Sequence, residues 1–145
     1  MDHRLASFAD FAVGQRASLT RTITAADVAA FRQLTGDANP LHEDEEFARR
    51  TFFGGTIAHG MLSASLFSTL IGMLLPGTGT VYRSQSLEFL RPVRPGDTLT
   101  AWGEVRVLDA AANRLELDTW IDNQHGQRVL AGRAVLSLLR GVKPA

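Results

Sequence analysis

The chain has 145 residues, of which 45% are hydrophobic, so it can bury the core of one compact domain and is not expected to be disordered. Its 15 Lys and Arg residues balance 15 Asp and Glu residues, which argues against nucleic acid or an anionic membrane as a partner. The absence of cysteine excludes disulfides, thiolate metal sites and cysteine nucleophiles. We expect a single domain over residues 1–145. Because the start of the chain lacks the apolar core of a signal peptide, we also expect a cytoplasmic location.

Two helices are predicted in the first third of the chain. Between residues 25 and 35, apolar side chains recur at helical spacing, after a threonine that can cap the helix and before a glycine that can end it. A short second helix within residues 39–51 begins with Asn39 at the N-cap and Pro40 at the first helical position. The sequence "GDANPLH" therefore lies at a helix-to-helix junction.

The run from Ile57 to Leu75 contains no Asp, Glu, Lys or Arg. Its length of about nineteen residues approaches the roughly 20 residues that cross a bilayer. However, His59 and several serines and glycines interrupt it, and no basic flank adjoins its ends. We therefore predict a fully buried helix of a soluble protein rather than a transmembrane helix.

The remainder of the chain has alternating apolar residues separated by turn sequences such as "RPGD" and "NQHG", which is typical of an antiparallel meander. Strands are predicted within residues 80–93, 97–110, 113–124 and 127–140, with residues 16–23 as a fifth. The expected fold is α+β, with an antiparallel sheet of about five strands wrapped around one long central helix and a short helical overhang before that helix. Such a sheet leaves an open side, so we expect a homodimer or a higher homo-oligomer.

The junction "GDANPLH" combines an acid, an amide and an imidazole within a few residues. Helix capping explains Asn39 and Pro40 but leaves His42 without a role. Because the turn is rigid, Asp37 and His42 can converge on a single water, and an imidazole with a pKa near 6.5 exchanges protons readily at neutral pH. From the residues alone, a structural turn and a device for hydration or dehydration both stay open.

The same stretch resembles the signature of the (R)-specific enoyl-CoA hydratases, also called hydratase 2 or MaoC-like hydratases. In that signature an aromatic and a small residue precede Gly-Asp-x-Asn-Pro-aliphatic-His, and a small residue follows six places later. The matching positions here are Phe31, Thr35, Gly36, Asp37, Asn39, Pro40, Leu41, His42 and Ala48. The likeness extends to "GGTIAHGMLSASLFS" and "LEFLRPVRPGDTLTAWGEV", so it covers roughly residues 34–105 and implies the hot-dog fold.

The resemblance implies that Asp37 and His42 activate one water for addition to C3 of a trans-2-enoyl thioester, and that Asn39 holds the pair in place. It implies an oxyanion donor at the backbone N–H of Gly60, an acyl-CoA substrate and no cofactor. We expect further substrate contacts from residues of the central helix and from arginines. Small residues on such a helix also serve close packing against the sheet, and most exposed arginines are only solvated. The candidates are Ser63, Ala64 and Phe67 along the central helix for the acyl group, and Arg83, Arg91 and Arg94 for the CoA phosphates.

A structural interpretation of His59 and two rival functions accompany this interpretation. His59 is interpreted as a helix-start residue with local hydrogen bonds, and the four histidines show no short metal-ligand spacing, so no metal site is predicted. A hot-dog thioesterase shares the fold and substrate class, but such enzymes commonly place an Asp or Glu on or beside the central helix, and Ile57–Leu75 has neither. A non-catalytic acyl-CoA-binding subunit keeps the same fold without the chemistry.

Overall fold

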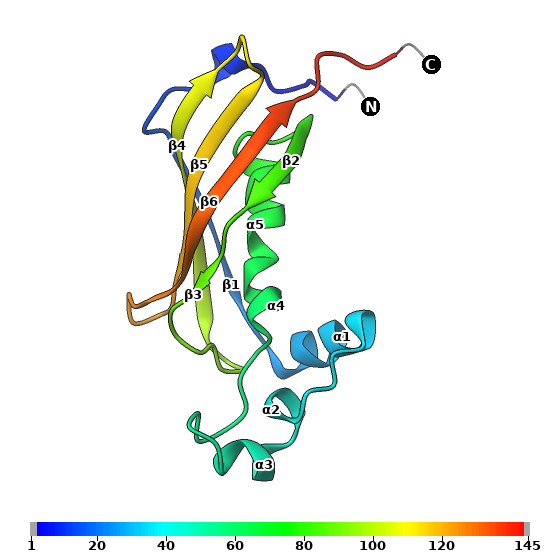
Figure 1. Cartoon of the computed structure of the whole chain (residues 1–145), viewed down its shortest axis with the longest axis vertical. Helices are drawn as coiled ribbons and strands as arrows, with labels where there is room; N and C mark the ends of the chain where they lie inside the picture. Colours follow the sequence, from blue (N-terminus) through cyan, green and yellow to red (C-terminus); the bar gives the residue numbers. More distant parts are fainter. Residues whose placement is uncertain (1–2, 144–145) are drawn as a thin grey trace.

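The computed structural model describes residues 3–143 and shows a twisted antiparallel sheet with a helix against one of its faces (Figure 1). The hydrogen-bonded order of the strands is β1-β4-β5-β6-β2, and β3 also pairs with β6. The strands are β1 (Arg16–Thr22), β2 (Thr80–Gln85), β3 (Glu88–Phe89), β4 (Thr98–Asp109), β5 (Arg114–Asp122) and β6 (Arg128–Leu138). The predicted α+β architecture is confirmed, with six strands in place of about five.

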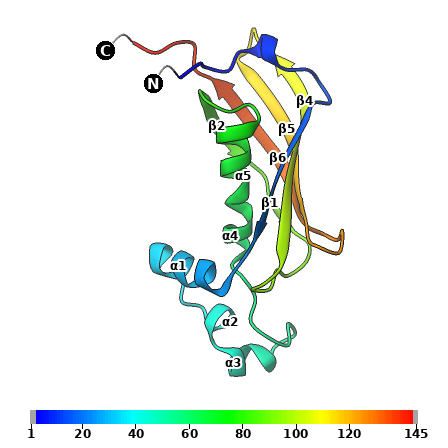
Figure 2. The ribbon, with the colours of Figure 1, turned by 180° about the vertical axis from the view of Figure 1, so that it is seen from behind.

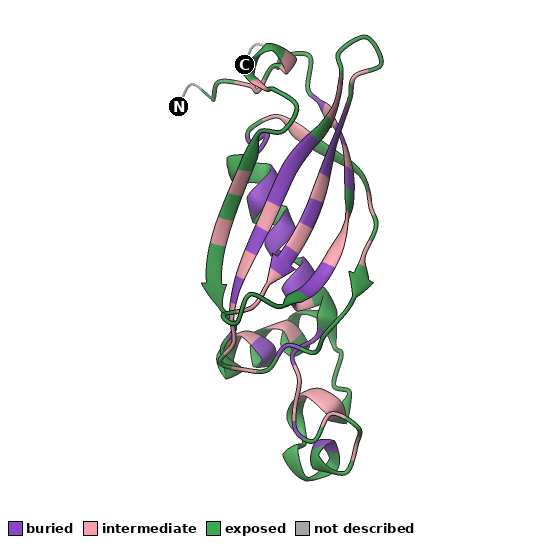
Figure 3. Ribbon diagram, turned by 90° about the vertical axis from the view of Figure 1, so that its left-hand side faces the viewer, coloured by how far each residue is buried: buried purple, intermediate pink, exposed green. Residues whose placement is uncertain are grey.

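The alternation of apolar residues places the core between the sheet and the helix. Leu115, Leu117 and Ile121 of β5 have no exposed surface, because residues two apart on a strand face the same side. Opposite them on β4, Val105 pairs with Leu117, and Ala101 pairs with Ile121. Figure 3 shows the buried residues gathered where the sheet meets the helix.

The predicted strand over residues 80–93 is divided by a bulge and a break into β2 and β3. The backbone of Ser86, at the break, crosses directly over Gly132 of β6: an ideal Cβ built on Gly132 would lie 1.8 Å from the Ser86 carbonyl oxygen. Only a glycine permits this approach. The sequence shows the apolar run but not the crossing that interrupts it.

The central helix begins at Gly60 and ends at Leu74, so it is shorter than the predicted run. It comprises α4 (Gly60–Ala64), α5 (Leu66–Thr69) and η2 (Leu70–Leu74), the last a π-helical turn. The expectation of a fully buried helix is wrong for one face, because the sheet covers only the other: Met61 is 56% and Met73 is 73% exposed. Across residues 3–143, no helix combines the length and the apolar character needed to cross a membrane.

The helical overhang lies at one end of the molecule, before the central helix, as Figures 1 and 2 show from opposite sides. Its first helix, α1 (Ala25–Thr35), begins with a reciprocal capping box between Thr24 and Asp27, as a Thr–x–x–acid sequence favours. It ends at Gly36, whose φ of 79° lies in the left-handed region. Both predicted ends of this helix are therefore confirmed.

The predicted second helix is two short helices, α2 (Pro40–Glu43) and α3 (Glu45–Arg49). The physical reason is Asp44, which adopts an extended conformation and accepts a hydrogen bond of 2.9 Å from the Phe47 N–H through its side chain. An aspartate used in this way starts a new helix rather than continuing the old one. The predicted N-cap and first position of α2, Asn39 and Pro40, are confirmed.

Candidate active site

The turn between α1 and α2 is held by side-chain and backbone hydrogen bonds. The carboxylate of Asp37 accepts from the Asn39 N–H at 3.1 Å, and the side-chain oxygen of Asn39 accepts from the Leu41 N–H at 3.1 Å. The Asn39 side chain thus caps α2, while its backbone orients Asp37. The Asp37 side chain remains 50% exposed, so the carboxylate is available to solvent and to a substrate.

The imidazole of His42 is fixed by a residue of the loop before the central helix. Its Nδ1 lies 2.7 Å from the carbonyl oxygen of Ile57. Because a carbonyl oxygen can only accept a hydrogen bond, Nδ1 carries the hydrogen in the neutral ring and Nε2 keeps its lone pair. His42 therefore presents a basic nitrogen on the side away from Ile57.

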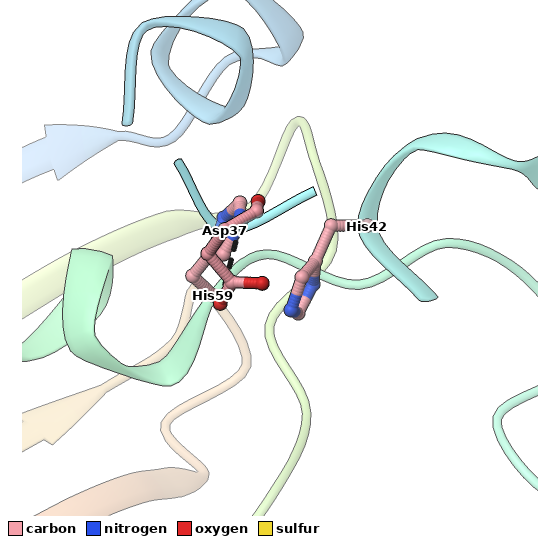
Figure 4. Close-up of side chains that lie close together, drawn as sticks. All are labelled: Asp37, His42 and His59. Carbon is pink, nitrogen blue, oxygen red and sulfur yellow. Dashed lines mark hydrogen bonds and ion pairs between the residues drawn. The ribbon is translucent and has the colours of Figure 1, made fainter. Parts of the chain in front are cut away.

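Asp37 and His42 face a common space. A carboxylate oxygen of Asp37 and a ring nitrogen of His42 lie within 4.8 Å of each other. Figure 4 shows a carboxylate oxygen of Asp37 directed toward the His42 ring. Since one hydrogen bond to water spans about 2.8 Å, a single water can contact both groups. The convergence expected from the sequence is present.

His59 lies directly beneath this pair, and its contacts were not predicted. Its ring is 2% exposed and packs against the His42 ring, with centroids 3.8 Å apart and ring planes tilted by 32°. Its Nε2 donates to the backbone oxygen of Asp37 at 3.0 Å and lies 3.9 Å from a carboxylate oxygen of the same residue. His59 does lie at the helix start, at the N-cap of α4, but its side chain makes no local capping bond and instead supports both members of the reactive pair. The only sequence signal for this role is its place beside Gly60 in the second resembling block.

Asp37, His42 and His59 together offer three potential metal ligands within 4.8 Å of one another, which their sequence spacing does not suggest. The His42 ring is already held through its Nδ1, which lies 2.7 Å from the Ile57 carbonyl oxygen, so only its Nε2 is left for a metal. In addition, the Nε2 of His59 is already bonded to a carbonyl oxygen. The arrangement suits proton transfer better than metal binding.

A cavity of about 530 Å³ opens beside the start of the central helix. Gly60 and Ser63 contribute to its wall, and so does Arg91, which also donates to the carbonyl oxygen of Arg128. The wall is otherwise largely apolar: Phe52, Phe53, Ile57, Ala58, Met61, Phe89, Leu90, Pro92, Val93, Val129 and Leu130. Two of the wall residues connect this cavity to the reactive pair. Ile57 accepts a hydrogen bond from His42, and Gly60 follows His59, which contacts Asp37.

The other predicted substrate contacts lie elsewhere. Ala64 and Phe67 are buried in the core, on the sheet-facing side of the helix, and do not line this cavity. The expected contact of these two residues with the acyl group is therefore not supported. Arg83 is exposed on the edge strand β2. The guanidinium of Arg94 donates to the carbonyl oxygens of Phe53 and Thr56. Of the three arginines, Arg91 alone lines the cavity.

Gly60 is the first residue of α4, where a backbone N–H has no partner within the helix. Beside it, the hydroxyl of Ser63 is buried and has no hydrogen-bond partner within residues 3–143. The ring of Phe89 packs on Gly60 so closely that an ideal Cβ there would lie 2.7 Å from its Cε1. A side chain at this position would therefore displace the Phe89 ring, and glycine leaves the backbone close to the cavity.

Comparison with known proteins identifies the family. The sequence model of the MaoC-like domain matches residues 10–115. The protein belongs to the MaoC-like family. An (R)-specific enoyl-CoA hydratase from Aeromonas caviae is 48% identical over 126 residues, which cover 87% of this chain and 94% of that relative. A 3-hydroxybutyryl-CoA dehydratase from Methylorubrum extorquens is 45% identical over 114 residues, with coverages of 79% and 73%.

Solved structures of MaoC-like relatives agree with the fold described above. The A. caviae (R)-hydratase involved in PHA biosynthesis superposes with a TM-score of 0.85 at 47% identity, covering 89% of this chain and 98% of that one. The R-hydratase PhaJ1 from Pseudomonas aeruginosa gives 0.85 at 38% identity, with coverages of 97% and 96%. The expected hot-dog fold is confirmed.

Proposed function

We propose that the protein catalyses the reversible (R)-specific hydration of trans-2-enoyl-CoA to (R)-3-hydroxyacyl-CoA, which makes it a hydro-lyase. The observation that carries this proposal is the pair formed by Asp37 and His42, whose polar atoms lie within reach of one water. The (R)-specific enoyl-CoA hydratase of A. caviae, at 48% identity over nearly its whole length, supports the same reaction.

In the proposed mechanism, the pair binds and activates the water. The hydroxyl of the water adds to C3 of the enoyl thioester, and a proton is delivered to C2, so that the atoms of one water are added across the double bond. Asp37 and His42 are the two acid-base groups, and either can take the proton of the water while the other supplies the proton to C2. His59 and the Asn39 backbone hold the two groups in position.

Hydration places negative charge on the thioester oxygen as the enolate forms, and this charge needs a donor. We assign that role to the Gly60 N–H at the start of the central helix, where the helix dipole adds a positive potential. The thioester would approach from the adjoining cavity, whose apolar wall suits the acyl group or the pantetheine arm. Arg91 at the cavity wall is the better-placed candidate for a CoA phosphate, and Arg83 is the weaker one. The Arg94 guanidinium is instead bonded to the carbonyl oxygens of Phe53 and Thr56.

A homodimer remains part of this proposal. The outer face of the central helix exposes Met61, Met73 and Leu74, and the edge strand β2 exposes Val81 and Tyr82. Exposed apolar side chains of this kind are unfavourable in water, and an unpaired edge strand can extend a sheet into a second copy. We further expect a cytoplasmic enzyme that uses no cofactor other than the CoA of its substrate.

The reaction is tested by following the loss of enoyl absorbance with crotonyl-CoA and longer trans-2-enoyl-CoAs, with chiral analysis of the product. Asp37→Asn and His42→Ala are each expected to lower kcat by about 10² to 10⁴. Wild-type rates in both folded variants, or an (S) product, would refute the proposal. Release of free CoA from saturated acyl-CoA, detected with a thiol reagent, would favour a thioesterase, and acyl-CoA binding without turnover would favour a non-catalytic subunit.

A further inference from the structure

The loop that joins the overhang to the central helix forms two hydrogen bonds with α2, both through the backbone of Ile57. The N–H of Ile57 donates to the carbonyl oxygen of Leu41 at 3.1 Å, and its own carbonyl oxygen accepts from His42 Nδ1 at 2.7 Å. The next N–H, that of Ala58, donates to the carbonyl oxygen of Val93 at 2.7 Å. The position of the Ile57 carbonyl therefore determines where the His42 ring is held.

Two charged side chains from distant parts of the chain hold this loop just before Ile57. The guanidinium of Arg94 donates to the carbonyl oxygens of Phe53 and Thr56, the latter at 3.3 Å. The carboxylate of Glu45 accepts from the Thr56 N–H at 3.0 Å. We call Arg94 and Glu45 the loop clamp, because between them they bond both backbone groups of Thr56.

The loop clamp fits closely around Gly55. This residue is buried, and a Cβ built on it would lie 3.2 Å from Arg94 Nη1 and 3.3 Å from Glu45 Oε1. Arg94 is itself anchored, since its backbone N–H donates to the side chain of Asp97 at 2.8 Å. The hydrogen bond from Thr56 and the nearby Arg49 keep the pKa of Glu45 below its ordinary value, so its carboxylate is charged at neutral pH. The backbone of Thr56, the residue directly before Ile57, is thus held on both its N–H and its carbonyl side.

We propose that Arg94 and Glu45 are positioning residues for His42. By fixing the Ile57 carbonyl, the loop clamp holds the imidazole as the Nδ1–H tautomer and keeps the lone pair of Nε2 available for proton exchange with the water. Neither residue touches the substrate in this role. The consequence for catalysis rests on the proposed function, in which His42 is one of the two acid-base groups.

The physical basis is the hydrogen-bonding inventory of a histidine ring. A neutral imidazole has one N–H and one lone pair, and the partner of one nitrogen decides the state of the other. If the Ile57 carbonyl moves away, the ring loses its acceptor, and the hydrogen redistributes between Nδ1 and Nε2. A ring protonated at Nε2 can no longer accept a proton from the water at that position.

The test reads the tautomer directly, without relying on turnover. Histidine is labelled with ¹⁵N in the full chain, the His42 signals are assigned with His42→Ala, and long-range ¹H–¹⁵N spectra are recorded above the histidine pKa. The variants are Arg94→Ala, Arg94→Lys, Glu45→Ala and Glu45→Gln. Arg50→Ala, which removes an exposed arginine from the same overhang, is the matched control.

In the wild type and in Arg50→Ala, His42 is expected as the Nδ1–H tautomer. Arg94→Ala and Glu45→Ala are expected to give a mixture with Nε2–H, and to lower kcat with crotonyl-CoA by up to about 10²-fold, as small misplacements of reacting groups do. Glu45→Gln keeps an acceptor for the Thr56 N–H and should restore the wild-type tautomer. Arg94→Lys, which cannot bond two carbonyl oxygens in the same fork, should be intermediate.

An unchanged His42 tautomer in folded Arg94→Ala and Glu45→Ala would overturn the positioning role. A changed tautomer with an unchanged kcat would confirm that the clamp positions the ring, and would instead refute the catalytic role of His42 in the proposed function. The two failures are therefore distinguishable.

Discussion

Gly60→Ala tests whether the thioester approaches the start of the central helix. The new Cβ would lie 2.7 Å and 2.8 Å from two carbons of the Phe89 ring, whereas carbon atoms in contact prefer 3.5–4.0 Å. The ring must therefore move by about 1 Å. Phe89 is 53% exposed and lines the cavity, so it has room to move, and the change displaces part of the cavity wall.

The expected loss is in activity rather than in stability. Alanine keeps the backbone N–H, and the half-exposed Phe89 ring can move aside at small cost. A displacement of about 1 Å beside the reacting atoms can lower the rate by about 10²-fold. We therefore expect a urea midpoint near that of the wild type, together with kcat/KM for crotonyl-CoA reduced by about 10²-fold.

The matched control is Gly72→Ala on the same helix, because a Cβ at Gly72 meets no atom within 4 Å. Both variants are assayed by enoyl absorbance after circular dichroism confirms folding. Hydration by Gly60→Ala at the wild-type kcat/KM would refute the placement of the thioester against Gly60. An equal loss in Gly72→Ala would show that the effect arises from the helix as a whole.

Three further predictions concern stability. Thr24→Ala removes the side chain that caps α1 and should lower the free energy of unfolding by about 1 kcal/mol in urea denaturation, whereas Thr24→Ser should restore it; equal stability of all three proteins would contradict the capping role. Leu117→Ala leaves a cavity at a fully buried position of β5 and should cost about 2–5 kcal/mol, against less than about 1.5 kcal/mol for Leu117→Met; similar costs for both would argue against tight packing there. The third concerns acid. A hydrogen bond from the Thr24 backbone N–H and, to a smaller extent, the Arg21 guanidinium keep the pKa of Asp27 below its ordinary value. The stabilisation by the Asp27 carboxylate is therefore present above about pH 4 and is lost as the pH falls through the folded-state pKa. Unfolding midpoints from pH 6 to pH 2 should fall less steeply in Asp27→Asn than in the wild type, and parallel curves would refute this.

Local signals in the sequence predicted the elements whose ends depend on neighbouring residues. The capping threonine, the left-handed Gly36 and the Asn39–Pro40 start each act within a few residues, so they predicted α1, the turn and the beginning of α2 correctly. Asp44 is also a local signal, but an acid in a helical pattern does not reveal whether it continues a helix or caps a new one. The Asp37 and His42 pair was predicted because its members lie on the same turn.

Features that depend on contacts between distant residues were not predicted. The break between β2 and β3 depends on Gly132, 46 positions after Ser86 in the sequence. The packing of His59 against His42 and the bonds of Arg94 to the loop arise only when the overhang meets the helix start. Residue type alone does not distinguish an arginine that binds a phosphate from one that binds carbonyl oxygens.

The overhang that carries the reactive pair is almost separate from the hydrophobic core. Helix α2 buries no residue, α1 buries only Val28, and α3 buries only Ala48, which lies outside the main core cluster. The sheet and the sheet-facing side of the central helix therefore account for most of the buried apolar surface, while hydrogen bonds and ring packing keep the pair in place. On gradual heating, such an enzyme should lose activity while its sheet is still intact, so its operating temperature would be set by the attachment of the overhang rather than by the melting of the fold.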